Sequence, residues 1–157
     1  MSKAGDLYDS DFVLWTEEQA ALLRNAKDSN LPLDWDNLAE EIESLGRSQR
    51  TELKSQIRRI LRHLFKLVAS PEAEPRGGWH ATIRDTRIEI EDLLEDSPSL
   101  RRDIADIVAK QARSAAKLAA ADLERHGEPA DKLWAILEQS GFSDEEVLGD
   151  WFPKRPG

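Results

Sequence analysis

Three acidic side chains stand within four positions of the segment NLAEEIESLG, residues 37–46: Glu40, Glu41 and Glu43. Carboxylates crowded on one helix could bind a metal ion, transfer protons or simply face water. Each residue of a helix advances by about 100°, so Leu38, Ile42 and Leu45 share one face, which we expect to be buried. Glu41 flanks that face, and we expect it to be the partly buried glutamate.

A buried carboxylate needs a cationic partner, because loss of water otherwise raises its pKa until the group is neutral. The candidate partners of Glu41 lie on later segments: Arg59, Arg62, His63, Lys66 and Arg87. A metal site of the di-iron bundle type would require a glutamate three positions before a histidine. The residues that precede the three histidines by three positions are Ile60, Gly77 and Leu123. That metal pattern therefore fails.

Motifs of known catalytic sites are not found in the sequence. It has no H-E-x-x-H, G-x-S-x-G, P-loop or G-x-G-x-x-G pattern. It has no cysteine, which excludes disulfides, thiolate catalysis and zinc–sulfur sites. We expect no cofactor and no metal, and we favour a protein that is not an enzyme.

A run of basic residues forms a candidate anion-binding stripe. Its members recur every four positions: Arg50, Lys54, Arg58 and Arg62. The acidic segments 34–43 and 85–96 could neutralise the stripe within a charge-complementary bundle. Alternatively, the stripe could bind nucleic acid or an acidic protein. We regard nucleic acid as an unlikely partner because the net charge is −9 and only Phe65 could stack a base near the stripe.

Apolar periodicity predicts an all-α fold. The helices are expected at about 16–27, 35–45, 48–69, 78–96, 99–125, 130–139 and 143–149. Thr16 and Gln19 predict a capping box at the N-terminus of the 16–27 helix, and Ser99 predicts an N-cap for the 99–125 helix. Gly46 predicts a stop or kink between the 35–45 and 48–69 helices. The arrangement we predict is a compact up-down bundle of about four main helices with a short helical C-terminal cap.

The length of 157 residues predicts a single helical domain over 1–157. Roughly the first six and last four residues are expected to be flexible. No apolar run reaches the length of a membrane span, no secretory signal is visible, and cysteine is absent. These features predict a soluble, acidic, cytoplasmic protein without membrane contact.

Five tryptophans are a high count for this length. Three of them are expected to be large core anchors: Trp15, Trp79 and Trp134. Exposure of Trp35 or Trp151 would instead indicate a contact surface, since tryptophan is enriched at binding hot spots.

Five blocks occur in an order and spacing that resemble a known family: YDSDFVLWTEEQAALLR, LDWDNLAEEIESLG, HLFK, WHATIRDTRIEIEDLL and SPSL. They are similar to the bacterial family labelled "domain of unknown function 29", from Tyr8 to the closing WFP. The resemblance implies an all-helical bacterial protein and brings no established activity. This chain departs from the family pattern at Leu67, where a tryptophan is common, and at Ser70-Pro71, where Gln-Pro is common.

The resemblance also implies a polar network, because five ionisable residues fall on family signature positions and could converge between helices: Glu41, Glu43, His63, Lys66 and Arg87. They could form a ligand-binding, metal-binding or enzymatic site, or a set of ion pairs that fixes helix register. We favour a non-enzymatic protein–protein interaction or regulatory module with a protein partner, and a homo-oligomer stays open. The alternatives are a site built from this cluster and a nucleic-acid-associated factor that uses the Arg50–Arg62 stripe.

Overall fold

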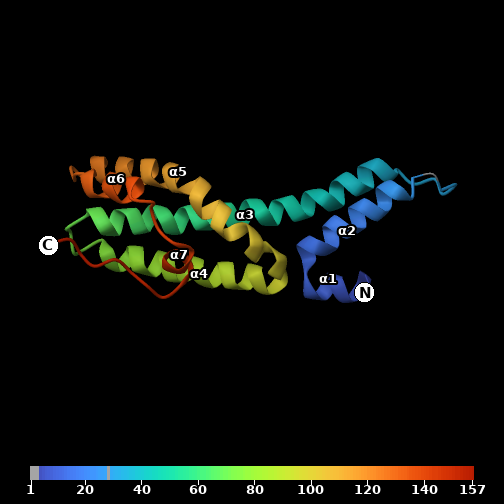
Figure 1. Ribbon diagram of the computed structural model, residues 1–157, viewed down its shortest axis with the longest axis horizontal. Helices are drawn as coiled ribbons and strands as arrows, with labels where there is room; N and C mark the ends of the chain where they lie inside the picture. The colour runs from blue at the N-terminus through green and yellow to red at the C-terminus, as the bar shows by residue number, and fades with distance from the viewer. Residues whose placement is uncertain (1–3, 28) are drawn as a thin grey trace. The chain divides into compact units, whose positions relative to one another are not determined.

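The computed structural model describes residues 4–27 and 29–157, and within these ranges it contains helices and no strand (Figure 1). The helices are α1 (Ala4–Ser10), α2 (Phe12–Asn25), α3 (Trp35–Ala69), α4 (Arg76–Asp96), the 3₁₀ helix η1 (Pro98–Asp103), α5 (Ile104–Arg125), α6 (Asp131–Glu138) and α7 (Asp144–Leu148). The predicted all-α class is confirmed.

Contacts divide the described residues into two compact units. Unit 1 comprises the chain up to Leu53 together with Glu91–Arg102, and unit 2 comprises Lys54–Ile90 and Asp103–Gly157. Helices α3 and α4 contribute residues to both units. The single domain and the flexible ends stay predictions, and residues 1–3 of the N-terminal segment lie outside the described residues.

In unit 1, helix α2 begins four residues earlier than the capping-box pattern predicts. Asp11 is the N-cap, because its carboxylate accepts a hydrogen bond from the Leu14 N–H at 2.9 Å. Thr16 is instead fully buried inside the helix and donates its hydroxyl to the Val13 carbonyl at 2.6 Å. The predicted capping box of Thr16 and Gln19 is therefore wrong.

Asp11 also ties the start of α2 to the segment that follows α4. Its carboxylate accepts hydrogen bonds from the Ser99 N–H at 2.6 Å and the Ser99 hydroxyl at 2.9 Å. The Ser97 hydroxyl accepts one from the Val13 N–H at 3.1 Å. The predicted cap at Ser99 is wrong, since this residue lies in η1 and α5 begins only at Ile104.

Helix α3 continues through Gly46, so the predicted stop at this glycine is wrong. Gly46 is buried and faces α2, where an added Cβ would overlap the Thr16 hydroxyl. The glycine is required by this close approach of two helices, and the approach compensates for its low helix propensity.

The predicted buried face of the 35–45 segment is also wrong. Ala39 and Gly46 are buried, whereas Leu38 is 40% exposed and Leu45 is 50% exposed. Because α2 packs so closely on α3, only small side chains fit between the two helices. The larger leucines therefore lie beside the contact rather than within it.

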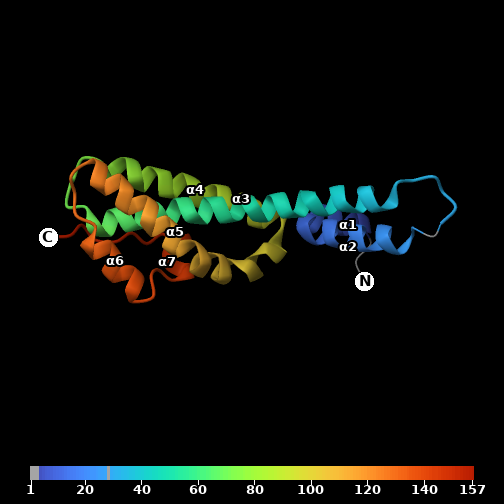
Figure 2. The ribbon, with the colours of Figure 1, turned by 90° about the horizontal axis from the view of Figure 1, so that it is seen from above.

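Unit 2 holds the larger apolar core. The second half of α3 lies beside α4 and α5 in both views (Figures 1 and 2). Helix α3 presents an apolar stripe whose residues have no exposed surface: Leu53 in unit 1, then Ile57, Ile60, Leu61 and Leu64 in unit 2. Helix α5 faces the core with Ala115 and Ala119, which permit close helix packing, and α6 and α7 both contact α5.

Substitution Gly46→Ala is expected to destabilise the protein by about 1–3 kcal/mol, because the new methyl group meets a buried, hydrogen-bonded hydroxyl. Equilibrium urea unfolding measures this change. The matched control is Gly78→Ala in the first turn of α4, where an added Cβ meets no atom within 4 Å. The control should be neutral or stabilising by up to about 1 kcal/mol. Equal effects of the two substitutions would contradict the close α2–α3 contact.

Candidate functional site

The structure gives the two glutamates of the predicted polar network different environments. Glu41 is exposed, whereas Glu43 is partly buried and forms an ion pair with Arg24 of α2. The hydrogen bond from Arg24 lowers the pKa of Glu43. The expectation that Glu41 is the partly buried glutamate is wrong, because α2 packs on the other edge of α3.

Arg87 has a separate role in unit 2, where it binds the C-terminal segment. Its guanidinium donates to the backbone carbonyls of Val147 at 2.9 Å, Glu146 at 2.9 Å and Trp151 at 2.8 Å. It also lies over the Phe152 ring, 4.8 Å from the centroid. Arg87 therefore holds the chain after α7 in place.

The predicted anion-binding stripe comprises Arg50, Lys54, Arg58 and Arg62. Its two ends are neutralised within the units that contain them, since Arg50 pairs with Glu17 and Arg62 pairs with Asp122. Between these ends, Lys54 is exposed and Arg58 is partly buried. The acids that neutralise the ends of the stripe thus belong to α2 and α5, whereas the segments 34–43 and 85–96 were expected to supply the partners.

His63 and Lys66, the other two members of the predicted network, line a cavity of about 600 Å³ in unit 2. This volume falls within the range of small-molecule sites. We call the cavity the Asp122 pocket. The charged and aromatic residues that line it include Arg62, His63, Lys66, Trp79, Asp122, Arg125 and His126. Residues of α3, α4 and α5 thus contribute to one concave surface.

Asp122 is the acidic centre of this pocket. Arg62 binds its carboxylate with two parallel hydrogen bonds, Nε to Oδ2 at 2.7 Å and Nη2 to Oδ1 at 2.7 Å. Arg125 adds a hydrogen bond at 2.8 Å, and the Lys66 ammonium lies 3.4 Å from Oδ2. The hydrogen bonds from Arg62 are the largest cause that holds the pKa of Asp122 well below its usual range.

Lys66 is the least exposed cation of the pocket, at 9%. Burial lowers the pKa of its ammonium group, while Asp122 opposes that shift. The ammonium lies 4.9 Å from the centroid of the Trp79 ring, which forms an aromatic side of the cavity. Lys66 follows Arg62 by four residues, so one face of α3 presents both cations to Asp122.

His63 presents a hydrogen-bond acceptor to the pocket. Its Nδ1 lies 2.8 Å from the Arg59 carbonyl, which can only accept, so Nδ1 carries the hydrogen. Nε2 of the neutral ring is then an acceptor. Burial lowers the pKa of His63, which favours this neutral form.

Sequence reasoning did not identify Asp122. Its position in the sequence could have indicated that it is buried, because Asp122 lies three residues after Ala119 and continues the buried stripe of α5. An acid on a core stripe requires a cationic partner. The expected acids on the 37–46 segment were too far along α3 to serve Lys66, because each residue adds about 1.5 Å to a helix.

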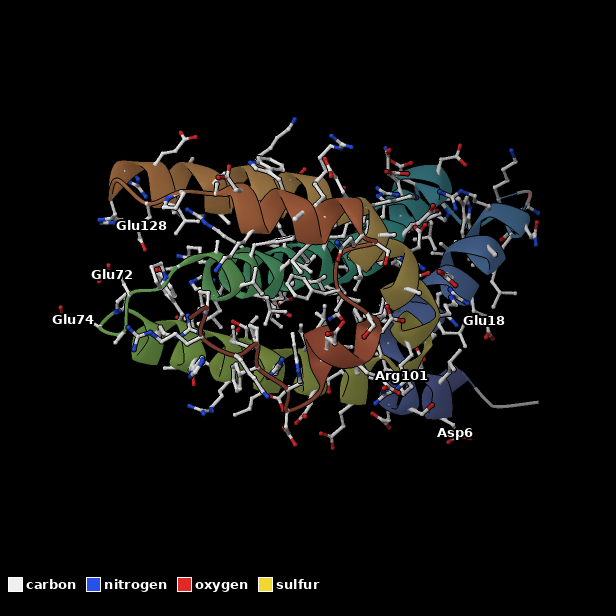
Figure 3. All side chains as sticks on the ribbon, turned by 60° about the vertical axis from the view of Figure 1, so that its left-hand side comes forward. Asp6, Glu18, Glu72, Glu74, Arg101 and Glu128 are labelled. Carbon is white, nitrogen blue, oxygen red and sulfur yellow. The ribbon has the colours of Figure 1, made fainter. Side chains whose placement is uncertain are left out.

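The mouth of the pocket is acidic. The buried Arg76 donates to the carbonyls of Leu67 at 2.9 Å and Ser70 at 3.1 Å, which fixes the turn between α3 and α4. Figure 3 shows Glu72 and Glu74 on this turn, at the same end of unit 2 as Glu128 after α5. These three glutamates line the pocket.

Unit 1 carries a second candidate surface beside the α2–α3 contact. Ion pairs mark one flank of the two helices, where Glu17 meets Arg50 and Arg24 meets Glu43. The helical advance of about 100° per residue places a different set of side chains on the opposite flank.

That opposite flank is apolar, and we call it the apolar flank. Its members are Tyr8, Trp15, Leu22, Leu38 and Leu45. Leu22 and Tyr8 are each 53% exposed, and the Tyr8 ring packs edge-on against Trp15 with centroids 4.9 Å apart. Four of these side chains are exposed and Trp15 is partly buried, so α1, α2 and α3 present large apolar residues on one side of unit 1.

The tryptophans differ from expectation. The expectation that Trp15, Trp79 and Trp134 are core anchors is wrong, since each is only partly buried. Trp35 is also partly buried, and Trp151 is 38% exposed. The exposure of Trp151 is the feature that we expected of a tryptophan in a contact surface.

In residues 4–27 and 29–157, no helix combines the length and the apolar character that crossing a membrane requires. Over the same ranges, no three histidine or carboxylate side chains gather as metal ligands would.

The helices and these two surfaces define an all-helical protein with a charged pocket and an exposed apolar flank. The chain belongs to the family described as "Domain of unknown function DUF29", whose model matches residues 7–152. The predicted family is thereby confirmed.

A solved structure shares the fold. It is the crystal structure of an alpha-helical protein of unknown function from Rhodospirillum rubrum, with a TM-score of 0.71 and 28% sequence identity. The similarity covers 93% of this chain and 91% of that chain. A comparison with curated proteins finds no match. The family and the solved structure are both described as being of unknown function, so function has to be argued from the surfaces themselves.

Substitution Arg87→Lys is expected to release the C-terminal segment, because a lysine cannot reach three carbonyls with a planar fork of donors. The free energy of opening for amides of residues 143–153 should fall by about 2 kcal/mol. Hydrogen exchange read by mass spectrometry measures it. Arg113→Lys, an exposed position on α5, is the control. Unchanged protection in Arg87→Lys would refute the anchoring role.

Substitution Asp122→Asn is expected to reduce the free energy of unfolding at pH 7 by about 3–5 kcal/mol, because three cations lose their shared carboxylate. The folded-state pKa of Asp122 is lowered, so its contribution is complete above the unfolded pKa of about 4 and is lost progressively as pH falls from there through the folded-state pKa. Urea unfolding at a series of pH values should therefore show the two proteins converging in acid. A difference that persists unchanged to pH 2 would count against the ionised carboxylate.

Proposed function

We propose that this protein is a non-enzymatic interaction module whose contact surface is the apolar flank of unit 1. The partner is an amphipathic helix of another protein, with basic residues beside its apolar stripe. The observation that carries the proposal is the gathering of large apolar side chains, half exposed, on one flank of the α2–α3 pair.

The spacing of the exposed leucines supports a helical partner. Leu38 and Leu45 are seven residues apart and lie two turns along the same side of α3. Apolar residues repeated at this interval are the contact positions of paired helices. Contiguous apolar surface of this kind marks interaction sites in soluble proteins.

Acidic residues border the flank and support a basic partner. Glu41 follows Leu38 by three residues and precedes Leu45 by four, so it is exposed beside both leucines. Glu18, labelled in Figure 3, is exposed four residues before Leu22 on α2. A second copy of a chain with net charge −9 would be repelled, whereas a basic helix would be attracted.

We place this role in the bacterial cytoplasm. The absence of cysteine suits a reducing compartment. The family resemblance noted in the sequence is to a bacterial family. A regulatory role is consistent with contact through one flank, because binding there leaves the pocket of unit 2 free.

Site-specific photo-crosslinking in the native host tests this proposal. A photoreactive amino acid at Leu38 should give an adduct whose crosslinked peptide has apolar residues three to four apart with neighbouring Lys or Arg. The substitution Leu45→Glu should abolish the adduct without loss of stability, since Leu45 is already half exposed. The matched control places the same group at Ile88, which is 57% exposed on α4 in unit 2.

Three results would contradict the proposal. The Leu38 adduct could join two copies of this chain, which light scattering of the purified protein would detect as a dimer. It could survive Leu45→Glu. Alternatively, Leu38 and Ile88 could give the same adducts, which would make the flank no different from any exposed apolar residue.

A further inference from the structure

We propose that the Asp122 pocket binds a small zwitterion, with the chemistry of a free amino acid, whose carboxylate meets the cations around Asp122 and whose ammonium group faces the acidic residues Glu72, Glu74 and Glu128. The pocket lies wholly in unit 2 and involves none of the residues of the apolar flank. The inference therefore stands or fails independently of the interaction proposed above.

The side of the pocket around Asp122 has more positive than negative charge. Arg62, Lys66 and Arg125 share the single carboxylate of Asp122, with the contacts of 2.7–3.4 Å given above. Two positive charges are in formal excess, and His63 is neutral in the form that its environment favours. An entering carboxylate would reduce that excess.

Lys66 and Arg125 have donors to offer a ligand. An ammonium group carries three hydrogens and a guanidinium carries five, and each of these side chains directs a donor to Asp122. Lys66 is nine-tenths buried, where an ionic hydrogen bond is less screened than at the surface. Burial lowers the pKa of Lys66, and a ligand carboxylate beside its ammonium group would oppose that shift.

The mouth determines which anions can enter. Glu72, Glu74 and Glu128 line the opening, and the Ser70 hydroxyl holds Glu128 by a hydrogen bond. Three carboxylates repel nucleotides and other polyanions but attract an ammonium group. A ligand that carries one charge of each sign therefore satisfies both ends of the pocket.

Trp79 gives the pocket an apolar side. Its indole is partly buried and forms one wall of the cavity, next to the Lys66 ammonium. The volume of about 600 Å³ exceeds that needed by the charged groups alone, so an apolar or aromatic ligand side chain would lie against this wall.

Binding can be tested with the twenty amino acids, added singly at millimolar concentration to the full chain in a thermal-shift assay. At least one should raise Tm, and isothermal titration calorimetry then gives its Kd. Its N-acetyl derivative, which lacks the ammonium charge, and its decarboxylated amine should each bind at least about tenfold more weakly.

Two variants locate the binding site. Arg125→Gln removes a cation whose side chain is 73% exposed, and the double variant Glu72→Gln with Glu74→Gln neutralises two exposed acids, so all should fold. Each variant should weaken binding at least about threefold to tenfold. Arg113→Gln, on α5 outside the pocket, should bind like the wild type.

The proposal is overturned if no amino acid raises Tm, or if the N-acetyl derivative binds as tightly as the parent. It is equally overturned if inorganic phosphate or citrate raises Tm more than any amino acid, because the mouth would then not select against polyanions. Unchanged affinity in both Arg125→Gln and the glutamate double variant would place the ligand elsewhere.

Discussion

The carboxylate of Asp122 is the constraint on which the arrangement of unit 2 depends. A charged group that is only 10% exposed must be compensated, and the structure compensates it with cations from two helices. Arg62 fixes both carboxylate oxygens, so the register between α3 and α5 is set within a fraction of a helical turn. Lys66 and Trp79 are then positioned around the cavity as a consequence, with the acidic turn of α3–α4 at its mouth.

Unit 1 is organised by a different constraint, which is steric. Small residues between α2 and α3 allow close contact, and Gly46 against Thr16 is its tightest point. Ion pairs occupy one flank of this contact, and the leucines excluded from it occupy the other. The exposed apolar surface is thus a direct consequence of close packing, because side chains too large for the contact have to lie beside it.

Much of the fold could be predicted from the sequence because local periodicity determines it. The stripe from Leu53 to Leu64 is apolar on one side only, and no other face competes for burial. The segment around Leu38 could not be assigned in the same way. Two faces compete there, one of leucines and one of Ala39 and Gly46, and only the position of α2 decides between them.

The site was predictable only in part, for a similar reason. The family resemblance indicated that His63 and Lys66 belong to a polar network, but the acid beside Lys66 comes from a helix some 60 residues later, at Asp122. Spacing along one chain does not report such a pairing. The same holds for Arg87, whose partners are backbone carbonyls that have no sequence signature.

Asp122 and Arg62 act as one unit that organises the pocket. A double-mutant cycle of Arg62→Met and Asp122→Asn, measured by urea unfolding at pH 7, tests this coupling most directly. We expect the two changes together to cost less than the sum of their separate effects, with a coupling free energy of at least about 1 kcal/mol. Additive effects of the two substitutions would show that the bidentate pair does not hold α3 and α5 together.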